Sequence, residues 1–148
     1  MEIRKAQPEE FEKIARFYAD SGYAPAIRQK DDFWLAEDSE VLLGVARLCK
    51  EEDVLVLRGM QVVEGMQRKG IGTALLNAIT PFVGKNECFC IPYQDLVSFY
   101  GQTGFVEVDV KDCPGFLADR ASEYNRKFDR GVVIMRRPRV LASRNVAT

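Results

Sequence analysis

A basic turn that contains glycine, residues 62–73, offers the clearest chemistry in the sequence. It joins an apolar segment, typical of a buried strand, to an amphipathic segment that is typical of a helix. Backbone N–H groups at such a helix start have no intrahelical partner, and the helix dipole adds positive charge there. Gly70 and Gly72 have no side chains to block an anion, and Arg68 and Lys69 add full positive charges. The pattern predicts a cradle for a pyrophosphate.

Two common nucleotide-binding motifs do not fit this turn. Gly65 and Gly70 have the spacing of a nucleoside-triphosphate P-loop, but Ile71 stands where that motif requires lysine. The dinucleotide fingerprint GxGxxG fails as well, because Leu75 follows Gly70 and Gly72 where the third glycine belongs. The anion is therefore expected to belong to another kind of ligand.

The sequence contains no histidine. This excludes Ser-His-Asp and Cys-His nucleophilic chemistry and every histidine-ligated metal site. The four cysteines form no CxxC pair and have no zinc-ligand spacing; they are Cys49, Cys88, Cys90 and Cys113. We expect no metal, and a general base must be a carboxylate, tyrosine, cysteine, lysine or positioned water.

A second motif follows downstream, where a tyrosine on a predicted short helix precedes Gly-Phe at the start of a strand. It reads Phe99-Tyr100-Gly101-Gln102-Thr103-Gly104-Phe105. With the turn Gln67-x-x-Gly70-x-Gly72, it makes the chain resemble the GNAT superfamily of acyl-CoA-dependent N-acyltransferases over roughly residues 2–137. The resemblance implies one mixed α/β domain, with a mostly antiparallel sheet of six to seven strands and helices on both faces.

The resemblance also implies that acetyl-CoA is the co-substrate. In this family the turn amides hold the CoA pyrophosphate, and free backbone groups of the preceding strand pair with the pantetheine arm. The matching residues here are Val62, Val63, Gln67, Arg68, Lys69, Gly70, Ile71, Gly72 and Thr73. Gly59, in the same apolar segment, predicts a bulge or a close approach to the backbone. Such a bulge would help to separate this strand from the next.

Catalysis in the family implies direct attack of an amine on the acetyl carbonyl, with Tyr100 protonating the CoA thiolate as it leaves. A phenol pKa of about 10 against a thiol pKa of about 8.5 makes this transfer slightly uphill, so the tyrosine must be well positioned. The alternative for Tyr100 is core packing beside Phe99. The base stays open between Glu37, Glu64 and a water relay. Many relatives carry asparagine seven residues before the tyrosine, where this chain has Tyr93.

Arg58 lies among apolar residues, where an unpaired guanidinium would be costly. It either recognises an acceptor carboxylate, with Arg47 assisting, or forms an ion pair with a neighbouring acid. Tyr23 and Glu37 are the other candidate acceptor residues. We expect a small-molecule or peptide amine as the acceptor, with a carboxylate-bearing small amine favoured. A homodimer is common among relatives of this kind.

Two other functions stay open. The first is a non-catalytic CoA-binding regulatory module, favoured by the lack of a recognisable base. The second is a nucleic-acid adaptor, which rests only on the arginines near the C-terminus (Arg136, Arg137, Arg139 and Arg144).

The elements that must position these residues follow from the apolar periodicity. A helix is predicted to begin at Pro8 and stop at Ser21-Gly22, and another to begin at Ile71 and end through Pro81 and Gly84. Further helices are expected over 95–103 and 116–128. The predicted strands are 2–6, 33–37, 41–49, 54–63, 87–91, 105–110 and 132–135.

Length and composition agree with one soluble globular domain. The chain has 148 residues, of which 47% are hydrophobic and 29% charged. Its net charge of −1 includes four arginines in the last thirteen residues, so the rest is acidic and suits nucleic acid poorly. No signal-like or membrane-length apolar run occurs, which predicts a cytoplasmic protein without a membrane partner. We expect a domain over 1–137 and a disordered basic tail over 138–148.

Overall fold

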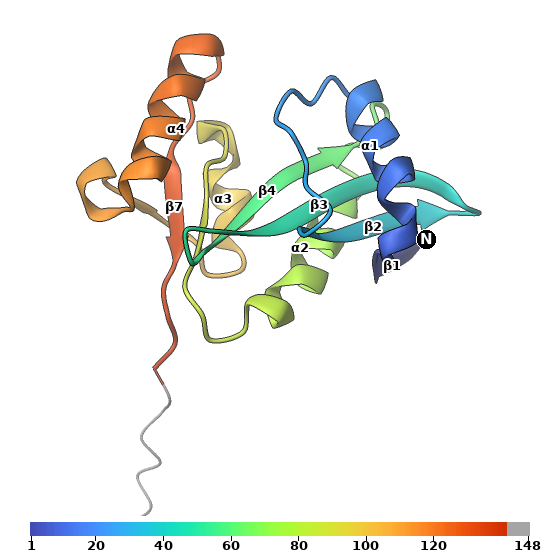
Figure 1. The fold of residues 1–148 in the computed structure, drawn as a ribbon, viewed down its shortest axis with the longest axis horizontal. Coiled ribbons are helices and arrows are strands. Elements are labelled where there is room, and N and C mark those ends of the chain that lie inside the picture. The colour runs from blue at the N-terminus through green and yellow to red at the C-terminus, as the bar shows by residue number, and fades with distance from the viewer. Residues whose placement is uncertain (142–148) are drawn as a thin grey trace, which may run out of the picture.

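A seven-stranded sheet with the strand order β1-β2-β3-β4-β5-β7-β6 forms the centre of the structure, a computed structural model that describes residues 1–141 (Figure 1). Only the β4–β5 pair is parallel among the neighbouring strands described. The strands are β1 (Glu2–Lys5), β2 (Asp32–Asp38), β3 (Val41–Glu51), β4 (Val54–Val62), β5 (Cys88–Cys90), β6 (Val106–Val108) and β7 (Ile134–Arg137). The predicted mixed, mostly antiparallel sheet is confirmed.

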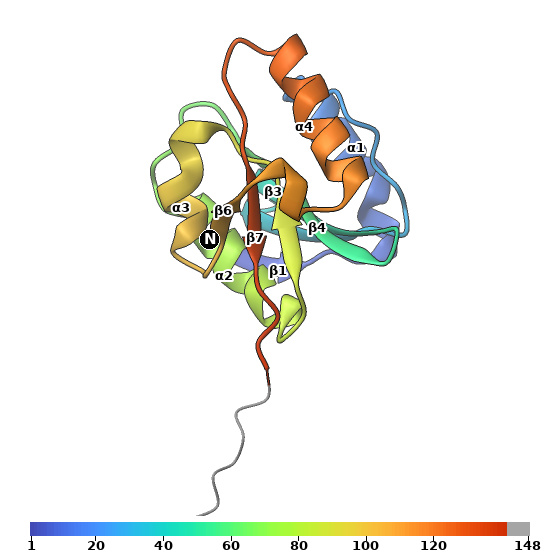
Figure 2. The same cartoon turned by 90° about the vertical axis from the view of Figure 1, so that its left-hand side faces the viewer.

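Helices cover both faces of this sheet, as predicted (Figure 2). Alternate side chains of β2 point to opposite faces: Phe33 and Leu35 pack under α1, whereas Trp34 and Ala36 pack against α2. Helix α4 lies on the α1 face over β4 and β5, and α3 lies on the α2 face. The helices are α1 (Phe11–Asp20), α2 (Ile71–Val83), α3 (Val97–Gly101) and α4 (Gly115–Lys127), with 3-10 turns at Pro8–Glu10, Gln94–Leu96 and Val110–Asp112.

Helix α2 begins at Ile71 and ends before Gly84, as predicted; the φ of Gly84 is 60°, and Pro81 lies within the last turn of the helix. Proline removes the bond to the carbonyl four residues earlier, and here that carbonyl belongs to the exposed Asn77, which water can reach. Two other predicted boundaries are wrong. The predicted helix 95–103 is a 3-10 turn followed by the five-residue α3, and the strand predicted over 105–110 shortens to β6.

The sheet opens where β4 and β5 part. The two strands pair only from Leu55–Leu57 to Cys88–Cys90. Beyond Cys90, Pro92 lacks a backbone donor, and the chain pairs instead with residues 132–133. Within the described chain, residues 58–62 of β4 therefore have no neighbouring strand on the β5 side.

The predicted bulge at Gly59 is confirmed. Its φ is 65°, and the β3–β4 register shifts between Val45 and Arg47 on the partner strand. The close approach to its backbone is also present, because a Cβ at this position would lie 2.7 Å from the Tyr18 hydroxyl.

The disordered tail over 138–148 and the cytoplasmic location both stay predictions. Of the predicted tail, residues 138–141 have no regular secondary structure, and the remainder lies outside the described residues. Within residues 1–141, no helix is both long enough and apolar enough to cross a membrane.

Candidate active site

A pocket of about 710 Å³ follows the opening between β4 and β5. One end is formed by the turn before α2, and the other end by the loop after α1 together with α4. The pocket brings together most of the side chains predicted to act. Those that line it are Tyr23, Arg58, Val62, Gln67, Arg68, Gly70, Gly72, Thr73 and Tyr100.

The turn end has the geometry of an anion cradle. Gly70 is the residue before the first turn of α2, with φ of 84°, and no side chain caps the helix N-terminus. The first N–H groups of α2 therefore remain available to a ligand. Arg68 also has a left-handed backbone, with φ of 65°, while Lys69 is exposed and Ile71 is buried. Ile71 can thus contribute through its main chain only.

The two strand residues predicted to pair with a ligand face different ways. The Val63 N–H donates to the Leu43 carbonyl at 2.8 Å, so it is used within the sheet. Val62 lies opposite Gly44 in the next pair of the ladder. Because hydrogen-bonded and non-bonded pairs alternate in antiparallel strands, the Val62 N–H and C=O point to the open side. There the Val62 carbonyl accepts a long bond, 3.4 Å, from the Gln67 side chain.

Tyr100 is almost fully buried, yet it lines the pocket. Its ring packs edge-on against Phe99 at 4.9 Å and Phe105 at 6.1 Å between centroids. Its hydroxyl bonds to no other described residue. Burial is the main cause that raises the pKa of Tyr100 well above its ordinary value, with Cys90 a smaller one. The phenol is therefore neutral throughout the physiological range and can donate a proton.

The two sequence motifs touch each other in the fold. A Cβ added at Gly72 would lie 3.2 Å from Cζ of Phe99, which immediately precedes Tyr100. The start of α2 and the start of α3 are therefore packed as closely as a glycine permits.

The other end of the pocket is built from side chains that are far apart in the sequence. Arg58 Nη2 donates to the Tyr124 hydroxyl at 3.0 Å, and Nη1 lies 3.7 Å from Glu51. Tyr23 forms a wall of this end, and its hydroxyl accepts a bond from Arg47 at 2.9 Å.

Arg47 does not reach the pocket and so does not assist Arg58 directly. It is 0% exposed and pairs with the buried Asp31 at 2.8 Å. Its Nε makes no hydrogen bond within the described chain. Arg47 instead connects the sheet to the loop that carries Tyr23.

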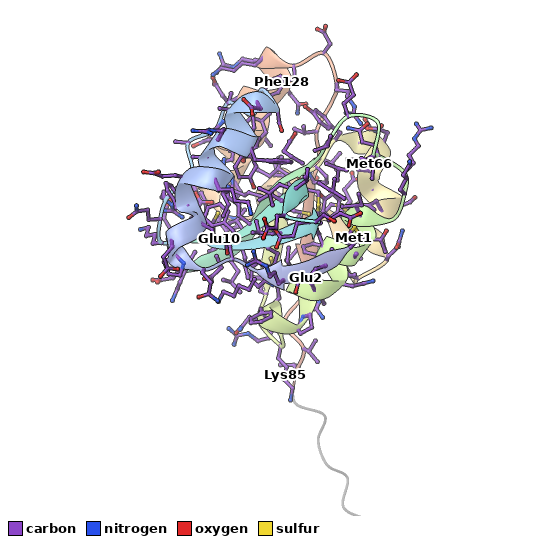
Figure 3. All side chains as sticks on the ribbon, turned by 90° about the vertical axis from the view of Figure 1, so that its right-hand side faces the viewer. Met1, Glu2, Glu10, Met66, Lys85 and Phe128 are labelled. Atoms are coloured by element: carbon purple, nitrogen blue, oxygen red, sulfur yellow. The ribbon has the colours of Figure 1, made fainter. Side chains whose placement is uncertain are left out.

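The two candidate bases lie outside the pocket. Glu37 accepts hydrogen bonds from Arg4 at 2.9 Å and Lys13 at 3.1 Å. Burial alone would raise the pKa of Glu37, but these bonds outweigh it and lower the pKa. Glu64 is exposed. In Figure 3, Glu10, which also binds Arg4, lies across the molecule from Met66 in the turn.

A family model for the acetyltransferase (GNAT) domain matches residues 2–114. The chain belongs to the GNAT acetyltransferase family. Among curated protein sequences, none matches it significantly.

Solved structures of other proteins share the GNAT fold. Rv2747 from Mycobacterium tuberculosis, in complex with CoA and NLQ, is 16% identical with a TM-score of 0.67, over 95% of this chain and 100% of that chain. The ribosomal-protein-S18-alanine N-acetyltransferase from Escherichia coli is 16% identical with a TM-score of 0.67, over 99% of both chains. N-acetylglutamate synthase from Neisseria gonorrhoeae, complexed with coenzyme A and N-acetyl-glutamate, is 20% identical with a TM-score of 0.66, over 95% of this chain and 35% of that chain.

Sequence reasoning missed the contribution of α4 to this GNAT domain. Helix α4 begins at Gly115, just beyond the residues that the family model matches. It supplies Arg120 and Tyr124 to the pocket. Their spacing of four residues places them on one helix face, but the sequence does not indicate which distant residue they meet. Asp95 and Arg130, which also line the pocket, form an ion pair at 2.7 Å.

Proposed function

We propose that this protein is an acetyl-CoA-dependent N-acetyltransferase that transfers an acetyl group to a primary amine by direct attack. One observation carries the proposal: the uncapped start of α2, the unpaired edge of β4 and Tyr100 all line one pocket. An anion site, a strand edge for amide groups and a proton donor are the three features that this reaction with CoA needs.

In this proposal the CoA pyrophosphate lies on the amides from Arg68 to Thr73. Lys69 adds positive charge from the exposed side of the turn. The pantetheine amides pair with β4 at Val62, in the manner of an added strand, replacing the long Gln67 bond to the Val62 carbonyl. Val63 follows β4 directly but does not donate its N–H to the ligand, because this N–H is bonded to the Leu43 carbonyl.

The proposed reaction depends on which groups in the pocket can donate a proton. The amine nitrogen attacks the acetyl carbonyl carbon, a backbone N–H of β4 stabilises the oxyanion, and the C–S bond then breaks. Tyr100 gives its proton to the leaving sulfur. The burial that raises the pKa of Tyr100 also disfavours a thiolate in the same pocket, so proton transfer remains feasible despite the raised phenol pKa.

The proton lost by the attacking amine leaves through water. Among the described residues that line the pocket there is one carboxylate, Asp95, and its oxygens accept bonds from Arg130 at 2.8 and 2.7 Å. Neither Glu37 nor Glu64 lines the pocket. Of the bases considered, a water relay fits this arrangement best, and it returns a proton to Tyr100 after the thiol has formed.

The acceptor in this proposal is a small amine that carries a carboxylate. Arg58 presents a guanidinium to the end of the pocket opposite the cradle, and Tyr23 forms a wall there. The Neisseria gonorrhoeae synthase with the same fold is complexed with coenzyme A and N-acetyl-glutamate, an acetylated amine of this class.

A panel of primary amines tested with acetyl-CoA checks the proposal through release of the free CoA thiol. We expect release with at least one carboxylate-bearing amine. The competing function, a non-catalytic CoA-binding module, is favoured because no unpaired carboxylate occurs among the described residues that line the pocket. Acetyl-CoA would raise the melting temperature under both functions, but thiol release that depends on the amine occurs only in an enzyme.

A further inference from the structure

Four side chains form a connected group at the α4 end of the pocket, which we name the α4 charge group: Glu51, Arg58, Arg120 and Tyr124. They come from the end of β3, from β4 and from successive turns of α4. The charged side chains are all largely buried, with 13% of Glu51, 16% of Arg58 and 20% of Arg120 exposed.

The carboxylate in this group is shared unequally between the two arginines. Arg120 binds both oxygens of Glu51, at 2.7 and 3.0 Å, in a bidentate arrangement. Arg58 approaches the same carboxylate only to 3.7 Å, beyond hydrogen-bond distance. Within the described residues, the one side-chain hydrogen bond made by Arg58 goes to the Tyr124 hydroxyl.

The charges of the group do not cancel. Burial works to raise the pKa of Glu51, but the hydrogen bonds from Arg120 outweigh it and lower the pKa, so Glu51 is ionised near neutral pH. Two guanidinium groups then face one carboxylate, and the surplus positive charge lies on Arg58. A guanidinium offers several N–H donors in a planar fork that matches a carboxylate.

We propose that Arg120 is a positioning residue that determines acceptor specificity: by holding Glu51, it leaves the Arg58 guanidinium free to bind the carboxylate of the acceptor. This inference rests on the proposed function of the pocket. Tyr124 fixes the orientation of Arg58 through the hydrogen bond that its hydroxyl accepts from Nη2. The single surplus charge favours a monoanionic carboxylate on the acceptor over a dianionic phosphate.

We expect that removing the charge of Glu51 improves binding of the acceptor. Glu51→Gln should lower KM for 3-aminopropanoate and 4-aminobutyrate about three- to tenfold, because no competing carboxylate then attracts Arg58. Arg120→Gln should raise KM for the same acceptors by a similar factor, since Glu51 is then released toward Arg58. Neither change should alter KM for the matching carboxamides.

The double variant separates positioning from simple damage to the fold. If Arg120 acts by holding Glu51, Arg120→Gln has no effect on the carboxylate preference once Glu51 is glutamine. Glu123→Gln is the matched control, because Glu123 lies on the same helix, pairs with Arg126 and Lys127, and does not line the pocket. It should leave all KM values unchanged. A loss of preference in Arg120→Gln that persists in the double variant would overturn the inference.

Calorimetry in the presence of CoA gives a readout that does not need turnover. We expect 4-aminobutyrate to bind the wild-type protein, to bind Glu51→Gln more tightly, and to bind better than its amide or O-phosphoethanolamine. Equal binding of acid and amide, or stronger binding of the phosphate compound, would overturn this inference even if amines are acetylated. Tighter binding by Glu51→Gln without any release of CoA thiol would support it and refute the proposed acetyl transfer.

Discussion

The two ends of the pocket are built from different parts of the polypeptide. At the turn end, the pocket is lined by Arg68, Gly70, Gly72 and Thr73 at the uncapped start of α2 and by the edge of β4, and the proposed ligand contacts are main-chain groups. At the α4 end, the groups that face the pocket are side chains from β4, α4 and the loop after α1. A main-chain site depends on a short local motif, whereas a side-chain site depends on which distant segments the fold brings together. The first suits a ligand common to a family, and the second suits a ligand that differs between its members.

Tyr100 lines the same pocket, and its loss should have the largest effect. We expect Tyr100→Phe to lower kcat by about 10²- to 10⁴-fold, the range for a lost general acid. CoA affinity, measured by calorimetry, should stay near the wild-type value because the cradle and the β4 edge are untouched. An unchanged kcat with several acceptors would remove Tyr100 from the mechanism and leave it as a core residue.

Arg47 supports the α4 end without lining it, so its loss should appear in stability. Arg47→Met leaves the buried Asp31 with Arg28 as its one charged partner within residues 1–141. We expect the free energy of unfolding to fall by about 3 kcal/mol, the lower part of the range for breaking a buried ion pair. Denaturant titration measures this change. A loss below about 1 kcal/mol would show that the pair contributes little to holding the Tyr23 loop.

Gly72 tests the turn end, although a larger side chain there also pushes against Phe99. Gly72→Glu places a carboxylate beside the expected pyrophosphate, and like charges so close cost several kcal/mol, which weakens CoA binding at least about 100-fold. Gly115→Glu is the control, since Gly115 is exposed, has open space around it and does not line the pocket. Wild-type affinity for CoA in Gly72→Glu would refute the cradle.

Arg58 tests the α4 end and should show a smaller effect that is selective for the acceptor. Arg58→Met should raise KM for carboxylate-bearing amines about 10- to 100-fold, the value of a charge-assisted hydrogen bond, with little change for their amides. Arg126→Met, on the exposed face of α4, serves as the control. Equal loss with acids and amides would mean that Arg58 supports the pocket without recognising the acceptor.

The difference between the two ends also explains what the sequence could predict. The turn, the bulge at Gly59 and the two motifs depend on local backbone requirements, so residues such as Gly70 and Gly72 indicate them directly. The seven-stranded sheet followed from apolar periodicity in the same way. The end of α2 at Gly84 followed from the sequence as well.

The roles of the charged residues were harder to predict, because they depend on partners from other segments. Arg47 and Arg58 lie on adjacent strands as cross-strand partners, but one points into the core and the other into the pocket. Glu37 lies on β2, next to β3, but its carboxylate already accepts hydrogen bonds from Arg4 and Lys13. Which acid meets which arginine is decided by tertiary packing, as the bidentate contact between Glu51 and Arg120 shows.

The contact between Gly72 and Phe99 has an evolutionary consequence. With only 3.2 Å between the Cβ position of residue 72 and the Phe99 ring, any larger side chain at 72 must push against the residue next to Tyr100. A homologue that enlarges position 72 should therefore carry a smaller residue at position 99. Positions 72 and 99 are therefore expected to vary together in size, which would link the evolution of the proposed anion site to that of the proposed proton donor, Tyr100.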